Sequence, residues 1–213
     1  MTPLHPPPPP DALRERIRAS MAETQPSGMS PSARALTSAA MVLAIVVGAI
    51  ALIRPDLAQL PQAALLTVTF GVGLLAVSTL IVALAPGSKG LGASVTLLVA
   101  FAMSTAPIYA VVTMIAALGA SPSIVPARNC FSMSMGFAAV VLTGLTWALR
   151  RSVPAAPIAR GALLGACAGA WAGLVIHLHC PSGDRLHILV GHAIPVAIFA
   201  VLGAILSPRF LRP

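Results

Sequence analysis

Side chains that bind metals or exchange electrons are concentrated in the second half of this chain of 213 residues: Cys130, Cys167, Cys180, His177, His179, His187 and His192. Thiolate and imidazole together suit zinc, cadmium or cuprous copper. Two of the thiols, Cys130 and Cys180, can alternatively form a disulfide in an oxidising compartment. A purely structural interpretation is also open, because buried cysteine often serves as a small packing residue. The choice depends on which elements bring these residues together.

The composition indicates that those elements lie in a lipid bilayer. Hydrophobic residues make up 57% of the chain and charged residues only 8%. A soluble domain carries about 25% charged residues, so this chain lacks the polar side chains to face water on all sides. A soluble enzyme, a disordered regulator and a secreted disulfide scaffold are thereby excluded. The net charge of +8 does not indicate binding to nucleic acid, because membrane proteins collect Lys and Arg in cytoplasmic loops.

Six segments are apolar and long enough to cross the bilayer as helices, which takes about 20 residues each. They span residues 35–53, 62–85, 91–118, 129–149, 161–178 and 187–206. The third is longer than a span needs and contains Pro107, which predicts a tilt, a kink or an end outside the membrane. We expect an all-α polytopic membrane protein with a cytoplasmic tail over residues 1–34, a six-helix domain over 35–206 and a second tail over 207–213.

The distribution of basic residues predicts the orientation. Six crossings place both termini on one side, and ten basic residues fall on that side against three on the other: Arg14, Arg16, Arg18, Arg34, Lys89, Arg150, Arg151, Arg160, Arg209 and Arg212 against Arg54, Arg128 and Arg185. The positive-inside rule therefore makes both termini cytoplasmic. The first span begins behind a proline-rich stretch, so we expect an uncleaved anchor rather than a signal peptide.

This orientation gathers the reactive residues at the outer boundary of the membrane. Cys130 opens the fourth span and Cys180 follows the fifth, while His177, His179 and His187 lie near the same level. His192 lies about one turn deeper. The candidate ligands for a soft metal ion are Cys130, His179, Cys180 and His187.

Gly161, Gly165, Gly169 and Gly173 repeat every four residues in the fifth span. This spacing aligns them in one groove, where the backbone of another helix can approach closely. We expect this helix at the centre of the bundle, and we expect Gly169→Leu to disrupt assembly.

Several functions require residues that the spans do not contain. No acidic or basic residue lies in the middle of any predicted span, which argues against an ion-coupled carrier. The chain has no Cys-x-x-Cys pair, and Cys167 falls mid-helix as a packing residue. We interpret Ser134 as an interhelical hydrogen-bonding group rather than a nucleophile paired with His192. A small-solute channel or exporter and a membrane thiol redox protein stay open as alternatives.

The amino-terminal tail predicts a binding element. A stiff proline run over residues 6–10 precedes a short amphipathic helix, which Asp11 can cap. Such a helix docks in the groove of a partner or lies on anionic lipid, and at about 14 residues it is unstable alone. The candidate partner-binding residues are Leu13, Arg14, Ile17, Arg18 and Met21.

Four stretches of the chain resemble one known family: Arg54-Pro55-Asp56-Leu57 after the first span, Arg128-Asn129-Cys130 at the start of the fourth, the glycine repeat that leads to His179-Cys180-Pro181, and the closing Ser207-Pro208-Arg209-Phe210-Leu211. Together they resemble NrsF-like inner-membrane anti-sigma factors with six helices. The resemblance covers the chain from about residue 35 to the end. The tail departs from the family, because a proline run replaces the usual short acidic and apolar opening.

The resemblance implies a regulator in the bacterial inner membrane rather than an enzyme. It implies a protein that holds an extracytoplasmic-function sigma factor away from RNA polymerase until an envelope signal, such as metal, oxidant or light-derived stress, releases it. It also implies that Cys130 and Cys180, which match outer cysteines of the family, sense that signal. The expected partners are the sigma factor and the lipid bilayer, with no direct nucleic acid. No cofactor is expected beyond transient binding of a soft metal ion.

Overall fold

The computed structural model describes residues 10–23, 61–84, 94–116, 126–149, 156–180 and 182–211, and these residues form helices and their connections without a strand. Five segments of this part of the chain are long and apolar enough to cross a membrane. The first predicted span, residues 35–53, lies outside the described residues. The elements are α1 (Asp11–Glu23), α3 (Gln62–Leu84), α4 (Val95–Ile115), α5 (Ala127–Ala148), α6 (Pro157–His179), α7 (Arg185–Ile188), the π-helical turn η2 (Leu189–Ala193) and α8 (Ile194–Leu211).

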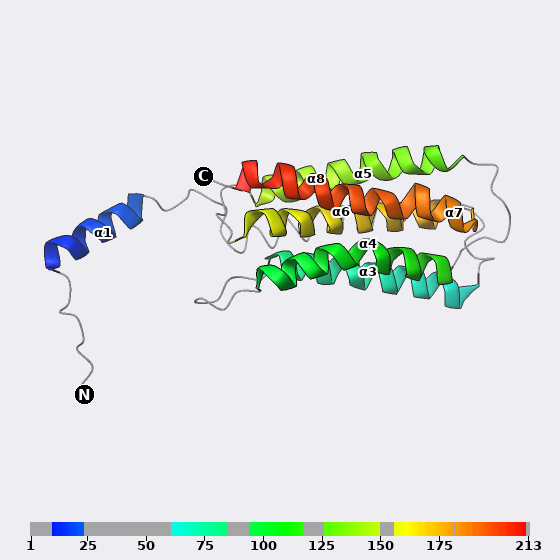
Figure 1. Ribbon diagram of the computed structural model, residues 1–213, viewed down its shortest axis with the longest axis horizontal. Coiled ribbons are helices and arrows are strands. Elements are labelled where there is room, and N and C mark those ends of the chain that lie inside the picture. Colours follow the sequence, from blue (N-terminus) through cyan, green and yellow to red (C-terminus); the bar gives the residue numbers. More distant parts are fainter. Residues whose placement is uncertain are drawn as a thin grey trace, which may run out of the picture.

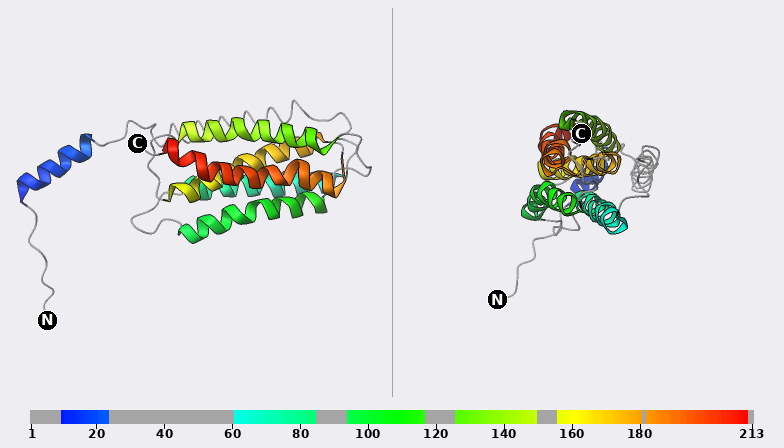
Figure 2. Two further views of the ribbon diagram at one scale, coloured as in Figure 1. Left: turned by 45° about the horizontal axis from the view of Figure 1, so that its top comes forward. Right: turned by 90° about the vertical axis from the view of Figure 1, so that its right-hand side faces the viewer.

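Helices α3, α4, α5, α6 and α8 lie side by side along the long axis of the molecule, and α7 lies at one end of this bundle (Figure 1). Seen along the bundle, α3 and α4 lie on one side of α6, with α5 and α8 on the other (Figure 2). The most apolar window of α6 is 89% buried, against 22% to 44% for the other four candidate spans. Helix α6 is therefore the central element, and the faces of the other helices that point away from it are open to lipid.

The glycines of α6 lie where its neighbours come closest. A Cβ atom added to Gly161, Gly165 or Gly169 would collide with the backbone of α8, whose Gly203 lies equally close to α6. A Cβ atom on Gly173 would instead meet the ring of Tyr109 in α4, with its Oη atom 2.6 Å away. Three of the four glycines thus bring α6 and α8 into backbone contact, and the fourth accommodates an aromatic side chain.

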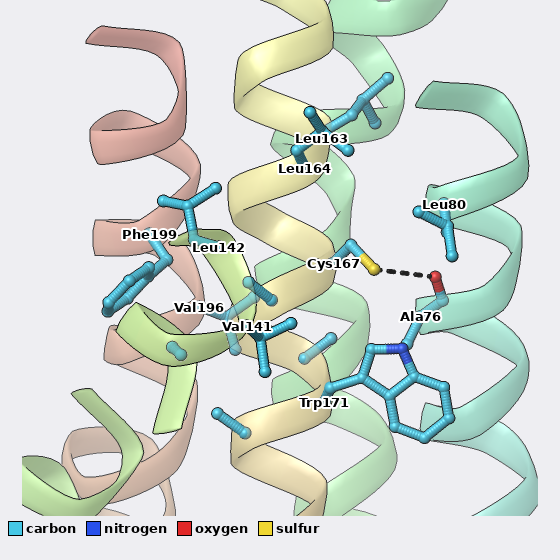
Figure 3. Packing of buried hydrophobic residues seen from close by; sticks show 14 of the residues in the cluster. Ala76, Leu80, Val141, Leu142, Leu163, Leu164, Cys167, Trp171, Val196 and Phe199 are labelled. Carbon is cyan, nitrogen blue, oxygen red and sulfur yellow. Dashed lines mark hydrogen bonds between the residues drawn. The ribbon is translucent and has the colours of Figure 1, made fainter. Parts of the chain in front are cut away.

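The core between these helices is apolar (Figure 3). Cys167 is fully buried in the middle of α6, where its thiol lies 3.5 Å from the carbonyl oxygen of Ala76 in α3 and donates a hydrogen bond to it. Leu163, Leu164 and Trp171 surround it on the same helix. Cys167 accordingly lies in the helix packing, away from the other two cysteines.

Several helix ends differ from the sequence-based boundaries. Helix α4 is 21 residues long, shorter than the predicted 91–118, and continues through Pro107. The last helix continues through Pro208 to Leu211, so the tail predicted from residue 207 begins as helix. In α1, the carbonyl of Pro10 accepts the first amide hydrogen bonds and Asp11 is the first helical residue rather than the cap. In this first turn, the negative charge of its carboxylate still interacts favourably with the positive end of the helix dipole.

Arg160 also differs from its predicted place in a cytoplasmic loop. Helix α6 begins at Pro157, so Arg160 belongs to its first turn and is only 7% exposed. Its guanidinium donates a hydrogen bond to the carbonyl of Ala83 in the last turn of α3. Carbonyl groups in the last turn of a helix have no partner within that helix, so Arg160 caps α3 and ties it to α6.

Candidate thiol–imidazole site

Four buried side chains converge at the end of the bundle where α7 lies: Cys130, Cys180, His187 and His192. Their sulfur and nitrogen ligand atoms all lie within 4.8 Å of one another. Cys130 comes from the first turn of α5, Cys180 follows the last residue of α6, and the two histidines come from α7 and η2. We call this group the thiol–imidazole cluster. Its donors could hold a metal ion of the soft or borderline class.

The two sulfur atoms are in direct contact. The thiol of Cys130 donates to Cys180 Sγ at 3.5 Å, and neither cysteine is part of a disulfide. Cys180 Sγ also lies 3.2 Å from His187 Nε2. The hydrogen bond from Cys130 lowers the pKa of the Cys180 thiol, and contacts with His192 and the Ser182 backbone act in the same direction against burial. This direction favours the thiolate form of Cys180, the form that binds metals and attacks oxidants.

The connection between α6 and α7 fixes the backbone of the cluster. The amide of Cys180 bonds to the Ile176 carbonyl at 2.7 Å and closes the last turn of α6. Asp184 caps α7, because its carboxylate accepts hydrogen bonds from the amides of Leu186 at 3.1 Å and His187 at 3.4 Å. This cap fixes the backbone at His187, which follows Cys180 by only seven residues in the sequence.

The π-helical turn aligns His192 with His187. In a regular α-helix, residues five apart point about 140° away from each other. In η2 the amide of Ile194 instead bonds to the carbonyl of Leu189, five residues earlier, and the widened turn places the two imidazole centroids 5.6 Å apart. Pro195 favours this irregularity, because it has no amide hydrogen for the carbonyl of Gly191 and its ring would crowd that carbonyl in an α-helix.

A glycine and a serine join α5 to this turn. A Cβ atom at Gly191 would lie 3.1 Å from the Cβ of Cys130 and 3.3 Å from the carbonyl oxygen of Ala127, so only a small residue allows the start of α5 to come this close. The Gly191 carbonyl accepts a hydrogen bond from the Ser134 hydroxyl at 3.0 Å. Ser134 thus makes an interhelical hydrogen bond at the side of the cluster.

The structure changes one member of the metal-ligand set that the sequence suggested. His179 is exposed and lies outside the cluster, while His192 contributes the fourth donor. The reason is helical geometry. Residues two apart in an α-helix are related by a rotation of about 200°, so His179 lies on nearly the opposite face from His177, which faces the core. His177 is 1% exposed, and its ring lies edge-on to that of His192 with a centroid distance of 5.3 Å.

The predicted partner-binding residues lie on α1, away from the cluster in the sequence. Leu13 is 47% exposed, and Arg14 Nη1 lies 4.0 Å from the Asp11 carboxylate. The side chains of Ile17, Arg18 and Met21 lie outside the part of the chain that the structure describes. The described side chains of α1 therefore include one large exposed apolar side chain, Leu13, and one charged pair.

Comparison with protein families shows which family the chain belongs to. The family described as "NrsF: Negative regulator of sigma F" matches residues 20–212. The chain belongs to the NrsF family. The match includes every residue of the thiol–imidazole cluster and all four glycines of α6, but it begins after Leu13, Arg14, Ile17 and Arg18. Comparisons with curated proteins and with solved structures found no match.

For this member of the NrsF family, His192 is the cluster residue that the sequence left out of the ligand set. Its sequence position placed it one α-helical turn deeper than the other histidines, because a regular helix was assumed. The signal that could have found it is Pro195, four residues after Gly191, since a proline at this position disrupts the α-helical ladder and favours a wider turn.

Proposed function

We propose that this chain is an inner-membrane anti-sigma factor that sequesters an extracytoplasmic-function sigma factor and releases it when the thiol–imidazole cluster senses an envelope signal. The observation that carries this proposal is the NrsF match over residues 20–212. Membership in this family makes the chain a negative regulator of a sigma factor. The candidate spans support a bilayer location, because five helices have the length and hydropathy of membrane spans.

The two ends of the bundle suit the two parts of this function, which are sensing a signal and holding a sigma factor. The cluster lies at the end where α5 and α8 begin, and Arg160 and Arg209 lie toward the other end. In the sequence, ten basic residues fall on the side of this opposite end and three on the side of the cluster, so the positive-inside rule predicts that the opposite end is cytoplasmic, where a sigma factor is found. Helices α5, α6 and α8 each extend from the cluster toward that end, so a change at the cluster has rigid elements along which to act.

The amino-terminal helix is our candidate for the sigma-binding element. Its predicted residues are Leu13, Arg14, Ile17, Arg18 and Met21, which repeat on the faces of a short helix. The family match begins at residue 20, so most of this helix lies outside the matched residues. A short amphipathic helix of this kind is stable when it docks in the groove of a partner.

The alternative functions have less support. A channel would present polar side chains along facing helices, but three buried threonines of α3 and α4 instead donate to carbonyls of their own helix: Thr79 to Leu75, Thr105 to Phe101 and Thr113 to Tyr109. A thiol redox protein would use the same cysteine pair. Quinone-dependent oxidation of a thiol substrate by the reconstituted protein would favour that alternative over sequestration.

Co-purification tests the proposal. The full chain, solubilised in detergent, is expected to retain an extracytoplasmic-function sigma factor from the same cells. Deletion of residues 1–30 is expected to abolish retention, whereas deletion of residues 1–9, which leaves α1 intact, is the matched control and is expected to retain it. Failure of the full chain to bind would overturn the proposed function. Retention by the longer deletion would contradict only the role of α1.

A further inference from the structure

We propose that the thiol–imidazole cluster is a closed, four-coordinate site for a soft or borderline d¹⁰ metal ion, such as Zn²⁺, Cd²⁺ or Cu⁺, with Cys130, Cys180, His187 and His192 as its ligands. This inference names the ligand of the sensing step and rests on the proposed function only for the link to the sigma factor. Binding of the ion itself can be tested on the isolated protein.

The distances between the donors suit tetrahedral coordination. Zinc binds sulfur at about 2.3 Å and nitrogen at about 2.0 to 2.1 Å, so donors in a tetrahedron lie roughly 3.3 to 3.8 Å apart. Cys130 Sγ and Cys180 Sγ are 3.5 Å apart, and Cys180 Sγ lies 3.2 Å from His187 Nε2. The largest donor separation is within 4.8 Å, so small rotations of the side chains complete the polyhedron.

The identity of the donors restricts the ion. Two sulfurs and two imidazole nitrogens match the donor set of zinc and its soft relatives, while Mg²⁺ and Ca²⁺ require oxygen ligands. The nearest carboxylate in the sequence, Asp184, is already engaged in capping α7. The protein fills all four positions, which is typical of structural or regulatory metal sites rather than catalytic ones, since those keep an open position.

The site also has the surroundings that hold metal ligands in place. The cluster residues are at most 6% exposed, so the bound ion is shielded from water. His177 lies edge-on to His192, where it can orient the ligand ring as an outer partner. Ser134 fixes the Gly191 carbonyl next to His192, and the Asp184 cap fixes His187. The backbone that carries the two histidine ligands is therefore held by contacts that do not depend on the ion.

An ion at this position would hold two further elements, α7 and η2, that a disulfide cannot reach. A Cys130–Cys180 bond would connect only the start of α5 to the end of α6. The four-coordinate ion also engages α7 and η2, which lead directly into α8. To change a two-state bundle from 1:99 to 99:1, the ion must bind one state about 10⁴-fold more tightly than the other. A site whose ligands come from separate helices can discriminate in this way, because movement of one helix removes a ligand.

The experiment uses the full-length protein in detergent, titrated anaerobically with Co²⁺ as a spectroscopic probe and then with Cd²⁺. We expect one ion per chain by elemental analysis, together with the visible bands of tetrahedral Co²⁺ and thiolate-to-metal charge transfer. His192→Ala is expected to weaken binding by at least about 10-fold. His179→Ala removes an exposed histidine from the same end of the bundle, and this matched control is expected to bind as the unchanged protein does.

The outcomes separate this inference from the proposed function. Absence of a stoichiometric tetrahedral Co²⁺ spectrum in the unchanged protein, or equal weakening by His179→Ala and His192→Ala, would overturn the metal site. If His192→Ala does not fold, the Co²⁺ spectrum of the unchanged protein still tests the site. Cys180→Ser is a second variant that removes a ligand. If the protein retains its sigma factor but binds no ion, only this inference fails. If it binds the ion but retains no sigma factor, only the proposed function fails.

Discussion

Cys180 is the residue on which the chemistry of the thiol–imidazole cluster most depends. It contacts the thiol of Cys130 at 3.5 Å and the Nε2 atom of His187 at 3.2 Å. Its lowered pKa, caused first by the hydrogen bond from Cys130, favours the thiolate over the thiol. The same sulfur can thus be a metal ligand or one end of a disulfide, and these two states exclude each other.

Oxidation of the pair is therefore predicted to compete with metal binding. Diamide added to the metal-free protein should take up the two electrons and two protons of Cys130 and Cys180 as they form a disulfide. Mass spectrometry of peptides should find the cross-link, and Co²⁺ binding should be lost until a reductant restores it. Cys167→Ser should behave as the unchanged protein does. Diamide treatment that leaves Co²⁺ binding intact would contradict the shared use of the sulfurs.

The hydrogen bond from Ser134 to the Gly191 carbonyl is predicted to contribute to stability. Ser134→Ala should lower the free energy of unfolding by about 0.5 to 1.5 kcal/mol, because it removes an interhelical bond between buried groups. Ser132→Ala is the control, since the exposed Ser132 hydroxyl bonds only to the Arg128 carbonyl of its own helix. Denaturant titration in detergent measures both. Equal effects of the two substitutions would show that the contact with η2 contributes nothing.

Part of the site could be predicted from the residues. The sequence places Cys130, Cys180 and His187 at one level, because each lies at the boundary of a predicted span. It cannot choose between His179 and His192, because that choice depends on which face of α6 turns inward and on the widened turn in η2. The inward face of α6 and the widened turn both result from packing between helices, which cannot be predicted from the hydropathy of a single segment.

At the scale of the elements, the contact between α6 and α8 organises the bundle. Its two backbones come close at Gly161, Gly165 and Gly203, where neither helix carries a side chain between them. Close approach of this kind gives extensive van der Waals contact, which drives helix association in lipid. The cluster lies at one end of this interface, since Cys180 follows α6 and His192 precedes α8.

Adding one methyl group to this interface is predicted to destabilise the protein. Gly165→Ala should lower the free energy of unfolding by about 1 to 3 kcal/mol, because the new Cβ would overlap the backbone of Phe199. Gly136→Ala in α5 is the matched control. A Cβ atom there meets nothing within 4 Å, so this change should be neutral or stabilise by up to about 1 kcal/mol.

Thermal unfolding in detergent distinguishes the two glycine variants, because only Gly165→Ala should lower Tm. The packing interpretation is wrong if Gly165→Ala unfolds at the same temperature as Gly136→Ala. The equivalent prediction from the sequence, that Gly169→Leu disrupts assembly, follows the same logic, since a Cβ at Gly169 would lie 2.6 Å from the Cα of Val196.

The glycine spacing predicts close helix contact but not which helix makes it. Four glycines at four-residue intervals define a groove on α6, yet one of them, Gly173, faces Tyr109 of α4 rather than α8. The hydropathy pattern likewise predicts the spans but not their ends, because helix α8 continues past residue 206 and α6 begins four residues before 161. Hydrogen bonds and capping at the ends set these limits, as Arg160 does for α3.

At the scale of the whole molecule, the orientation in the membrane decides whether the cluster can sense an envelope signal. Cys180 is 3% exposed, so its own labelling reports burial as well as sidedness. Arg185 and Arg209 are exposed and lie near opposite ends of the bundle, which makes them better positions for reporters. Only Arg185 lies on the side predicted to face outward.

Impermeant maleimide labelling of intact cells measures this orientation. Arg185→Cys is predicted to react from outside, and Arg209→Cys is predicted to react only after the membrane is permeabilised. The unchanged protein provides the background from its buried cysteines. Labelling of Arg209→Cys in intact cells, with Arg185→Cys protected, would reverse the topology and place the cluster in the cytoplasm.

The most direct test of the central claim is retention of the sigma factor before and after the cluster is loaded. The detergent-solubilised complex is immobilised through the chain, treated with Cd²⁺, and the sigma factor released is measured by immunoblot. We expect release from the unchanged protein and retention by the Cys130→Ser, Cys180→Ser double variant. Equal release from both proteins, or no release from either, would contradict this expectation.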